Sequence, residues 1–297
     1  MSGRRESEEG MVLVNVLLLV GLAAAVLAIM VAGDDAGLQR ATRMAEAAQA
    51  QQIARGGELS AIAALRRDMI QAPDSDDATE PWANIDEKGA AIEGGRFALT
   101  VADATGKLDL NALAKDDPVA KGRLATMAGA LALPPGSAER IAGFLVIAGP
   151  IVDIAELGGA GLSAGEIAKL APYVTALPLP TTINLNAVPE ALLALLIDNP
   201  VAARGLIARR TRNGRLTRDD FSLEQAAIPP GCGFTSSFFW SVAEARIGGT
   251  RQTLTSLIER RKIEGGTPFV AAVVRWRGTA PLQAPAPRMS DSMQASR

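Results

Sequence analysis

The residues of this chain that could do chemistry are short acidic runs, a set of arginines and one cysteine. The chain has no histidine, which excludes Ser-His-Asp catalysis, Cys-His catalysis and metal sites that depend on imidazole. Cys232 is the one cysteine, so paired-cysteine zinc motifs and an intramolecular disulfide are excluded. A lone cysteine is more typical of a small buried residue than of a nucleophile. We therefore expect no enzyme activity, no catalytic residue and no cofactor.

The acidic runs could supply oxygen ligands to a hard cation such as calcium. Counted from the first residue of the first run, however, a calcium loop would need glycine where Thr79 stands and glutamate where Ile85 stands. We therefore predict solvated loops and no metal site. The runs are Asp74-Ser75-Asp76-Asp77, Asp116-Asp117 and Asp219-Asp220.

A glycine-rich segment over residues 159–164 has the spacing of a dinucleotide-binding turn. That motif needs a preceding strand and an acidic residue about 20 positions later to hold a ribose, and residues 175–186 contain no acid. We interpret the segment as a turn between helices.

The arginines could bind nucleic acid. They follow the phrase Ile183-Asn184-Leu185-Asn186-Ala187, which resembles helix-hairpin-helix DNA-binding modules, and a membrane-tethered periplasmic DNA-binding protein is the main alternative function. The turn of such modules carries glycine, whereas residues 198–201 here are Asp-Asn-Pro-Val. With 30 Lys+Arg and 32 Asp+Glu the formal net charge is −2, so we expect no nucleic acid partner. The arginines are Arg204, Arg209, Arg210, Arg212, Arg215 and Arg218.

An apolar run near the N-terminus precedes all of these residues in the chain. Residues 11–32 carry no charge and one strongly polar side chain, Asn15. As a helix this run is about 33 Å long, enough to cross the hydrocarbon core of a bilayer. Arginines precede it and aspartates follow it, which favours a cytoplasmic N-terminus. We predict a single transmembrane helix over residues 11–33.

The residues in front of this run resemble the leader of type IV pilins and type II secretion pseudopilins. A short polar leader ends in Glu9-Gly10, and the apolar run begins at Met11. The resemblance implies that prepilin peptidase cuts after Gly10 and that Met11, the new N-terminus, is methylated. The fifth mature residue of the family is usually glutamate, whose buried carboxylate meets the amine of a neighbouring subunit, and here it is Asn15. An unprocessed bitopic scaffold with an ordinary signal anchor is a second alternative.

The rest of the chain predicts a helix, a hairpin, a helical block and late strands. Helical spacing continues over residues 34–72, where Gly56 and Gly57 would allow a bend. Residues 97–101 and 107–110 predict the two arms of a hairpin. Helical patterns occupy 120–131, 137–147, 164–173 and 189–197, and strand patterns occupy 237–246, 250–259 and 269–277.

One short phrase occurs twice, because Asp109-Leu110-Asn111-Ala112 returns as Asn184-Leu185-Asn186-Ala187. In both copies an asparagine stands between a strand pattern and a helical pattern, where its side chain can cap free backbone amides. We predict a structural role for the phrase rather than a shared ligand.

The order of these elements resembles that of the K-type minor pseudopilins of bacterial type II secretion. The resemblance implies an α+β fold: a pilin-like long N-terminal helix, membrane-spanning in its first half, packs on a small antiparallel sheet, and a large all-helical domain is inserted between the early and late strands. Further landmarks are Pro81-Trp82, Gly106-Lys107-Leu108, Asp153-Ile154-Ala155-Glu156-Leu157, Leu170-Ala171-Pro172-Tyr173 and Val188-Pro189.

The resemblance divides the chain into seven parts. They are a cytoplasmic leader (1–10), the transmembrane helix (11–33), a periplasmic amphipathic helix (34–72), the first part of the sheet (73–115), the inserted helical domain (116–232), the second part of the sheet (233–279) and a Pro-rich disordered tail (280–297). Family members usually carry a calcium-holding acidic loop after the helix that matches residues 138–147, but here Gly149-Pro150 leads almost directly to Asp153. Calcium binding is therefore not carried over.

The function that the resemblance implies is to cap or initiate the tip of the periplasmic pseudopilus. The implied partners are other minor pseudopilins, the inner-membrane platform of the secretion system, prepilin peptidase and the inner membrane. The bulk of the chain would be periplasmic. A large helical domain would obstruct a subunit stacked above it, and Asn15 removes a subunit contact, so both features favour the tip.

Overall fold

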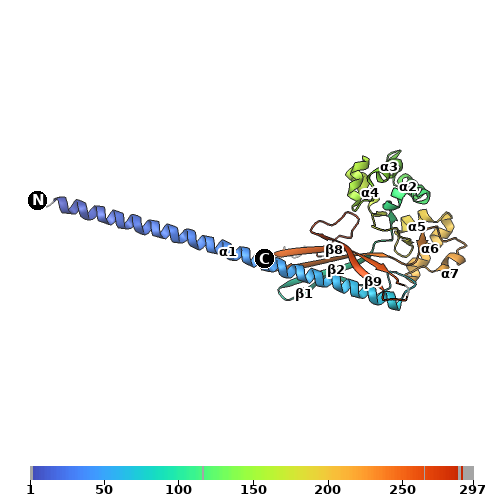
Figure 1. Ribbon diagram of the computed structural model, residues 1–297, viewed down its shortest axis with the longest axis horizontal. Helices are drawn as coiled ribbons and strands as arrows, with labels where there is room; N and C mark the ends of the chain where they lie inside the picture. Colours follow the sequence, from blue (N-terminus) through green and yellow to red (C-terminus); the bar gives the residue numbers. More distant parts are fainter. Residues whose placement is uncertain (1–2, 116, 264, 287–288, 290–297) are drawn as a thin grey trace.

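One continuous helix forms the shaft of the molecule (Figure 1). The computed structural model describes residues 3–115, 117–263, 265–286 and 289. Helix α1 spans Gly3–Gln71; its first part projects away from the rest of the chain, and its second part packs on β7, β8 and β9. The helix continues through Gly56 and Gly57 without interruption.

A five-stranded antiparallel sheet packs against the second part of α1. Its order is β1-β2-β7-β8-β9. Both edge strands carry a register shift, between Lys88 and Ala90 in β1 and opposite Leu257/Ile258 in β9, and such bulges discourage edge-to-edge pairing. The strands are β1 (Asp86–Ile92), β2 (Gly95–Asp103), β7 (Phe238–Ile247), β8 (Thr250–Arg261) and β9 (Phe269–Arg277).

The predicted late strands are confirmed, but the predicted early hairpin is wrong. Strand β2 pairs with β1 on one side and β7 on the other, and not with residues 107–110. The Asp103 side chain accepts hydrogen bonds from the amides of Thr105 and Gly106, which ends the strand and turns the chain out of the sheet. The turn residues therefore start a new domain instead of closing a hairpin.

The helical domain is inserted between two neighbouring strands of the sheet, β2 and β7. It consists of two units, each closed by a short parallel strand pair: β3 (Leu108–Asp109) with β4 (Val174–Thr175), and β5 (Ile183–Asn184) with β6 (Cys232–Gly233). The domain thus begins at β3 and not at residue 116. The first unit holds η1 (Leu110–Lys115), α2 (Pro118–Ala130), α3 (Ser137–Ala148), η2 (Ile154–Ala160) and α4 (Ala164–Leu170); the second holds α5 (Glu190–Leu196), α6 (Pro200–Asn213) and α7 (Arg218–Leu223).

The repeated phrase has the same role in both units. The Asn111 amide donates to Asp109 Oδ1 at 3.1 Å, and the Asn186 amide donates to Asn184 Oδ1 at 3.0 Å, immediately after β3 and β5. The Asn111 side chain then binds the backbone of Ile151 and Leu177, and Asn186 Oδ1 accepts from the Leu216 amide. The structural role predicted for the phrase is confirmed.

Helices α6 and α7 lie beyond the predicted helical patterns. Asn199 caps α6 by accepting from the Val201 amide, and Pro200 occupies its first turn. Thr217 and Asp220 form the capping box of α7. These caps were present in the sequence, but the arginines interrupt the apolar periodicity on which helix prediction depends.

The segment after the sheet differs from the predicted disordered tail. Gln283 is 3% exposed, and its side chain hydrogen-bonds to the backbone of Val152 and Ile154. Residues 287–288 and 290–297, also predicted as disordered, lie outside the described residues.

We expect opposite effects from alanine at the two adjacent glycines of α1. A Cβ at Gly57 would lie 2.7 Å from Phe97 Cζ and 3.0 Å from Ala243 Cβ, whereas a Cβ at Gly56 meets nothing within 4 Å. Gly57→Ala should lower the free energy of unfolding by about 1–2 kcal/mol through overpacking. Gly56→Ala should raise it by about 0.5–1 kcal/mol through helix propensity. Thermal unfolding of both variants measures this, and equal shifts would contradict the close packing of α1 on the sheet.

Candidate functional site

The predicted processing residues and the predicted transmembrane helix all lie on the projecting part of α1. Gly10, Met11 and Asn15 are in helical conformation, and the Asn15 side chain is exposed. The apolar side chains that follow Asn15 are exposed as well; Leu18, for example, is 70% exposed. By length and composition α1 can span a membrane. A fully exposed apolar stretch of this length needs lipid or other apolar helices around it.

A buried polar junction connects this shaft to the sheet and the helical domain. Arg260 of β8 is 6% exposed and donates through Nη1 to Asp68 Oδ2 of α1 at 2.8 Å and through Nη2 to Asp76 Oδ1. Its guanidinium carbon also lies 4.6 Å from the centre of the Phe239 ring. Arg260 therefore binds the end of the shaft, the loop that follows it and the sheet at once.

Asn184 and Ser236 extend the junction into the helical domain. The Asn184 side-chain amide donates to Asp76 O at 2.8 Å, Ser236 Oγ at 2.7 Å and Asp103 Oδ2 at 2.9 Å. The Ser236 amide donates to Asp76 Oδ2 at 2.7 Å. Since Asp103 begins the excursion into the helical domain and Ser236 ends it, these bonds fix the entry and the exit of the domain together.

The carboxyl groups of the junction have raised pKa values. Burial raises the pKa of Asp76 to about 6, although Arg260 and the Ser236 amide act in the opposite direction. Burial, with the neighbouring Asp68, Asp76 and Asp77, raises the pKa of Glu80 to about 7. Burial also raises the pKa of Asp103 and of Asp68. One arginine does not compensate for the desolvation of all these groups.

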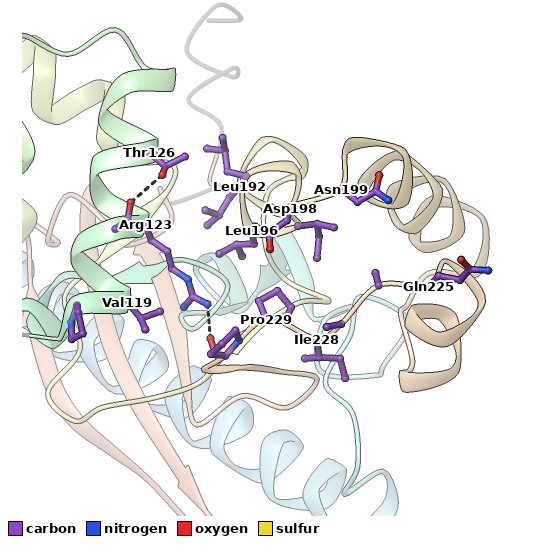
Figure 2. A pocket seen from close by; sticks show the side chains of 17 residues that line it. Val119, Arg123, Thr126, Leu192, Leu196, Asp198, Asn199, Gln225, Ile228 and Pro229 are labelled. Carbon is purple, nitrogen blue, oxygen red and sulfur yellow. Dashed lines mark hydrogen bonds between the residues drawn. The ribbon is translucent and has the colours of Figure 1, made fainter.

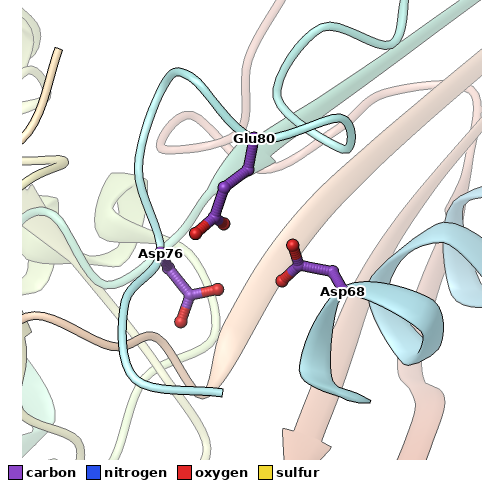
Figure 3. A group of neighbouring side chains, drawn as sticks. All are labelled: Asp68, Asp76 and Glu80. Atoms are coloured by element: carbon purple, nitrogen blue, oxygen red, sulfur yellow. The ribbon is translucent and has the colours of Figure 1, made fainter. Parts of the chain in front are cut away.

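Asp68, Asp76 and Glu80 are also the best candidate for metal ligands among the described residues (Figure 3). Their nearest carboxylate oxygens all lie within 4.8 Å of one another. However, Arg260 already binds Asp68 and Asp76, and Glu80 accepts a hydrogen bond from Trp82 Nε1. Because these hydrogen bonds already satisfy the three carboxylates, the cluster is described better as an internal ion-pair network than as a cation site.

The interpretation of residues 74–77 as a solvated loop is wrong for the second half of the run: Asp74 is exposed, but Asp76 and Asp77 are 0% and 3% exposed. The hydrogen bonds of the junction replace water around Asp76, whereas Asp77 accepts hydrogen bonds from the Ser75 hydroxyl and the Thr79 amide. The other runs have capping roles: Asp117 accepts from the Val119 amide at the start of α2, and Asp220 belongs to the capping box of α7. Asp219 is exposed, and Asp116 lies outside the described residues. Residues 159–164 contain the predicted turn between helices: 161–163 connect the end of η2 to the start of α4.

The structure divides the arginine set in two. Arg209 donates to Glu224 Oε1 at 2.7 Å, and Arg210 donates to the carbonyls of Leu185 and Val188 at 3.0 and 2.7 Å. These two side chains hold α6 in place and are not available to a phosphate. The remaining members, Arg204, Arg212, Arg215 and Arg218, are exposed.

Cys232 and the groove beside it do not form a reactive site. The groove has a volume of about 500 Å³ and lies between α2, α5 with the loop after it (197–199), and residues 225–230 (Figure 2). Arg123 lines it and donates to the Pro230 carbonyl. Burial raises the pKa of Cys232, although Arg123 lies 3.7 Å from its sulfur, so the group remains a thiol.

Sequence reasoning did not find Arg260 or the junction. Arg260 lies one residue beyond the strand pattern predicted over 250–259, and its partners come from positions near 68, 76 and 236. The available signal was the unusual density of aspartate after the amphipathic helix, which we interpreted as solvated.

We expect Glu80→Gln to make the protein more stable at pH 8 and to have little effect near pH 5. A carboxyl whose pKa is raised on folding stabilises the protein at low pH, and this contribution is lost as the pH rises from its unfolded pKa, about 4.5, to its folded pKa, about 7. Glutamine keeps the acceptor for Trp82 and removes the charge. Melting temperatures at the two pH values measure the effect, with Glu93→Gln in the exposed β1–β2 turn as the control. A stability gain that is the same at both pH values would refute the assignment.

Comparison with known proteins agrees with this architecture. No protein-family model matches the chain. Over 301 aligned residues the chain is 26% identical to type II secretion system protein K of Pseudomonas aeruginosa, with 87% of this chain and 90% of the relative covered.

The fold is also similar to a solved structure. A chain in the crystal structure of the GspK-GspI-GspJ complex from the type 2 secretion system of enterotoxigenic Escherichia coli superposes with a TM-score of 0.62 at 22% identity. The superposition covers 81% of this chain and all of that chain. The α+β fold expected from the resemblance is confirmed. The element order and these two matches agree: the chain is similar to type II secretion system protein K in sequence and to a chain of the GspK-GspI-GspJ complex in fold.

Proposed function

We propose that this protein is a minor pseudopilin of type II protein secretion that caps or initiates the tip of the periplasmic pseudopilus. The proposal rests mainly on the different surroundings of the two parts of α1. Its first part is apolar and exposed, whereas its second part is packed on the sheet. A subunit of this form can leave a bilayer and bury its apolar helix among the helices of neighbouring subunits without refolding.

The position of the helical domain supports a place at the tip. The domain lies at the end of the molecule opposite the N-terminus (Figure 1). A subunit stacked above would meet this bulk. Asn15 supports the same place, because it lacks the carboxylate that would pair with a neighbouring subunit's amine.

The role is assembly rather than catalysis. The buried ionisable groups of the junction are bound to one another and to backbone groups, and Cys232 is a half-buried thiol with a raised pKa. The partners that fit this role are other minor pseudopilins, as in the complex that provides the fold match, together with the inner-membrane platform. The chain would cross the inner membrane once, with a cytoplasmic leader at 1–10, a membrane helix at 11–33 and the remainder in the periplasm.

Binding of DNA is not favoured over this role. Arg209 and Arg210 are used inside the helical domain, and the net charge is −2. At the start of α6 the Asn199 side chain accepts from the free amides of Val201 and Ala202, and Pro200 has no N–H, so this turn does not offer glycine amides to a phosphate.

We predict that the protein isolated from its native membranes begins at a methylated Met11. Gly10→Val should leave the chain uncut, because a branched side chain at the cleavage position obstructs the peptidase. Gly21→Ala is the control: it also changes a glycine of α1, where a Cβ meets nothing within 4 Å, and should leave processing unchanged.

Intact mass and the sequence of the N-terminal peptide measure both results. A wild-type chain that begins at Met1 or Ser2 would exclude the pseudopilin pathway and favour an unprocessed bitopic scaffold.

A further inference from the structure

A short segment after β9 is bound between the helical domain and the sheet in the manner of a peptide ligand. We call residues Pro281–Ala284 the tail segment. Gln283 is 3% exposed, its Oε1 accepts from the Ile154 amide at 3.1 Å, and its Nε2 donates to the Val152 carbonyl at 2.8 Å. Both ends of the side-chain amide are thus paired with backbone groups of the helical domain.

The backbone of the tail segment is bound as well. The Leu282 amide donates to Asp153 Oδ1 at 3.1 Å. The Gln283 carbonyl accepts from Lys107 Nζ at 3.5 Å, and the same ammonium donates to the Ala171 carbonyl at 2.9 Å. Recognition of backbone groups together with one specific side chain is typical of peptide-binding sites.

The segment also contacts the sheet, so it bridges two parts of the molecule. Ala284 packs against the apolar cluster that contains Trp240 and Leu257 of the sheet and Leu177 of the helical domain. This cluster lies on the opposite face of β7 from Phe239 and Ala243, which pack with α1. The polar junction and the tail segment therefore fasten the helical domain at two separate places.

The chemistry of the site selects glutamine. It presents a backbone N–H at Ile154 and a backbone C=O at Val152, which require one acceptor and one donor on the same side chain. Glutamate would place an acceptor against the Val152 carbonyl, and leucine would leave both groups buried without that partner. Burial lowers the pKa of Lys107, in agreement with a water-poor site.

The tail segment forms a β-turn, in which the Ala284 amide donates to the Pro281 carbonyl at 3.0 Å. We propose that Lys107, Val152, Asp153 and Ile154 form a binding site for a glutamine-containing peptide in this turn conformation, that the chain's own tail segment occupies it, and that this occupation holds the helical domain against the sheet. The site is independent of the proposed secretion role. Its ligand class is a peptide with a Leu-Gln-Ala core.

Hydrogen exchange on the full chain tests the proposal. In Gln283→Leu the Ile154 amide should exchange about five- to tenfold faster than in the wild type, since one buried hydrogen bond is lost. The amides of α2 should keep their protection, which separates release of the segment from unfolding. Leu282→Ala is the matched control, because Leu282 is 49% exposed and its backbone makes the bond to Asp153. Unchanged exchange at Ile154 in Gln283→Leu would overturn the proposal.

A second experiment tests the site as a peptide receptor. A chain that ends at Thr279 is mixed with a synthetic peptide of residues 280–286, and a chain that ends at Ala286 serves as the control with its site occupied. We expect saturable binding to the shorter chain, at least tenfold weaker binding when glutamate replaces glutamine in the peptide, and no binding to the control. Equal binding of the two peptides, or binding to the control chain, would show that the contact is non-specific and would overturn the proposal.

Discussion

The ion pairs of Arg260 are the interaction on which the architecture depends. The shaft, the loop after it and the sheet meet at this guanidinium, which binds Asp68 and Asp76 in a site closed to water. Removing one partner of such a network leaves a buried charge unpaired, which costs about 3–5 kcal/mol. A helix that leaves a membrane and carries a domain at its far end needs a rigid connection to that domain. The polar junction provides it, because a cooperative hydrogen-bond network has a defined geometry.

The connectivity of the sheet explains why the helical domain can be large. The chain leaves the sheet after β2 and returns in β7, and these strands are neighbours, paired from Gly95↔Ile247 to Asp103↔Phe239. The domain is therefore an excursion between adjacent strands that leaves the register of the sheet intact. The two ends of the domain, Asp103 and Ser236, are held together because the Asn184 side chain donates to both. The entropic cost of closing a long loop grows only slowly with the length of the loop. The bulk added at the end of the shaft is thus compatible with a pilin-like core.

Much of this fold could be predicted from the sequence, because local patterns encode it. The apolar run after Gly10, the caps of α2 and α4, and the strand patterns of β7, β8 and β9 each depend on residues close in the chain. The polar junction could not be predicted in this way. Arg260, Asp68, Asp76 and Ser236 are far apart in sequence, and burial of an aspartate depends on partners that only the tertiary structure brings near. The same holds for Gln283, which lies in a Pro-rich segment with the composition of a disordered tail.

The central claim is that α1 is the surface through which this subunit joins others, and in-cell photo-crosslinking tests it most directly. A photoreactive amino acid would be placed at Leu38 or Met44, which are 68% and 74% exposed on α1, and at Leu223, which is 65% exposed on the helical domain, as the control. The account predicts that the α1 positions crosslink to other proteins that carry a prepilin-type leader, and that Leu223 does not. Crosslinks to such proteins from Leu223 alone, or none from α1 in actively secreting cells, would contradict it.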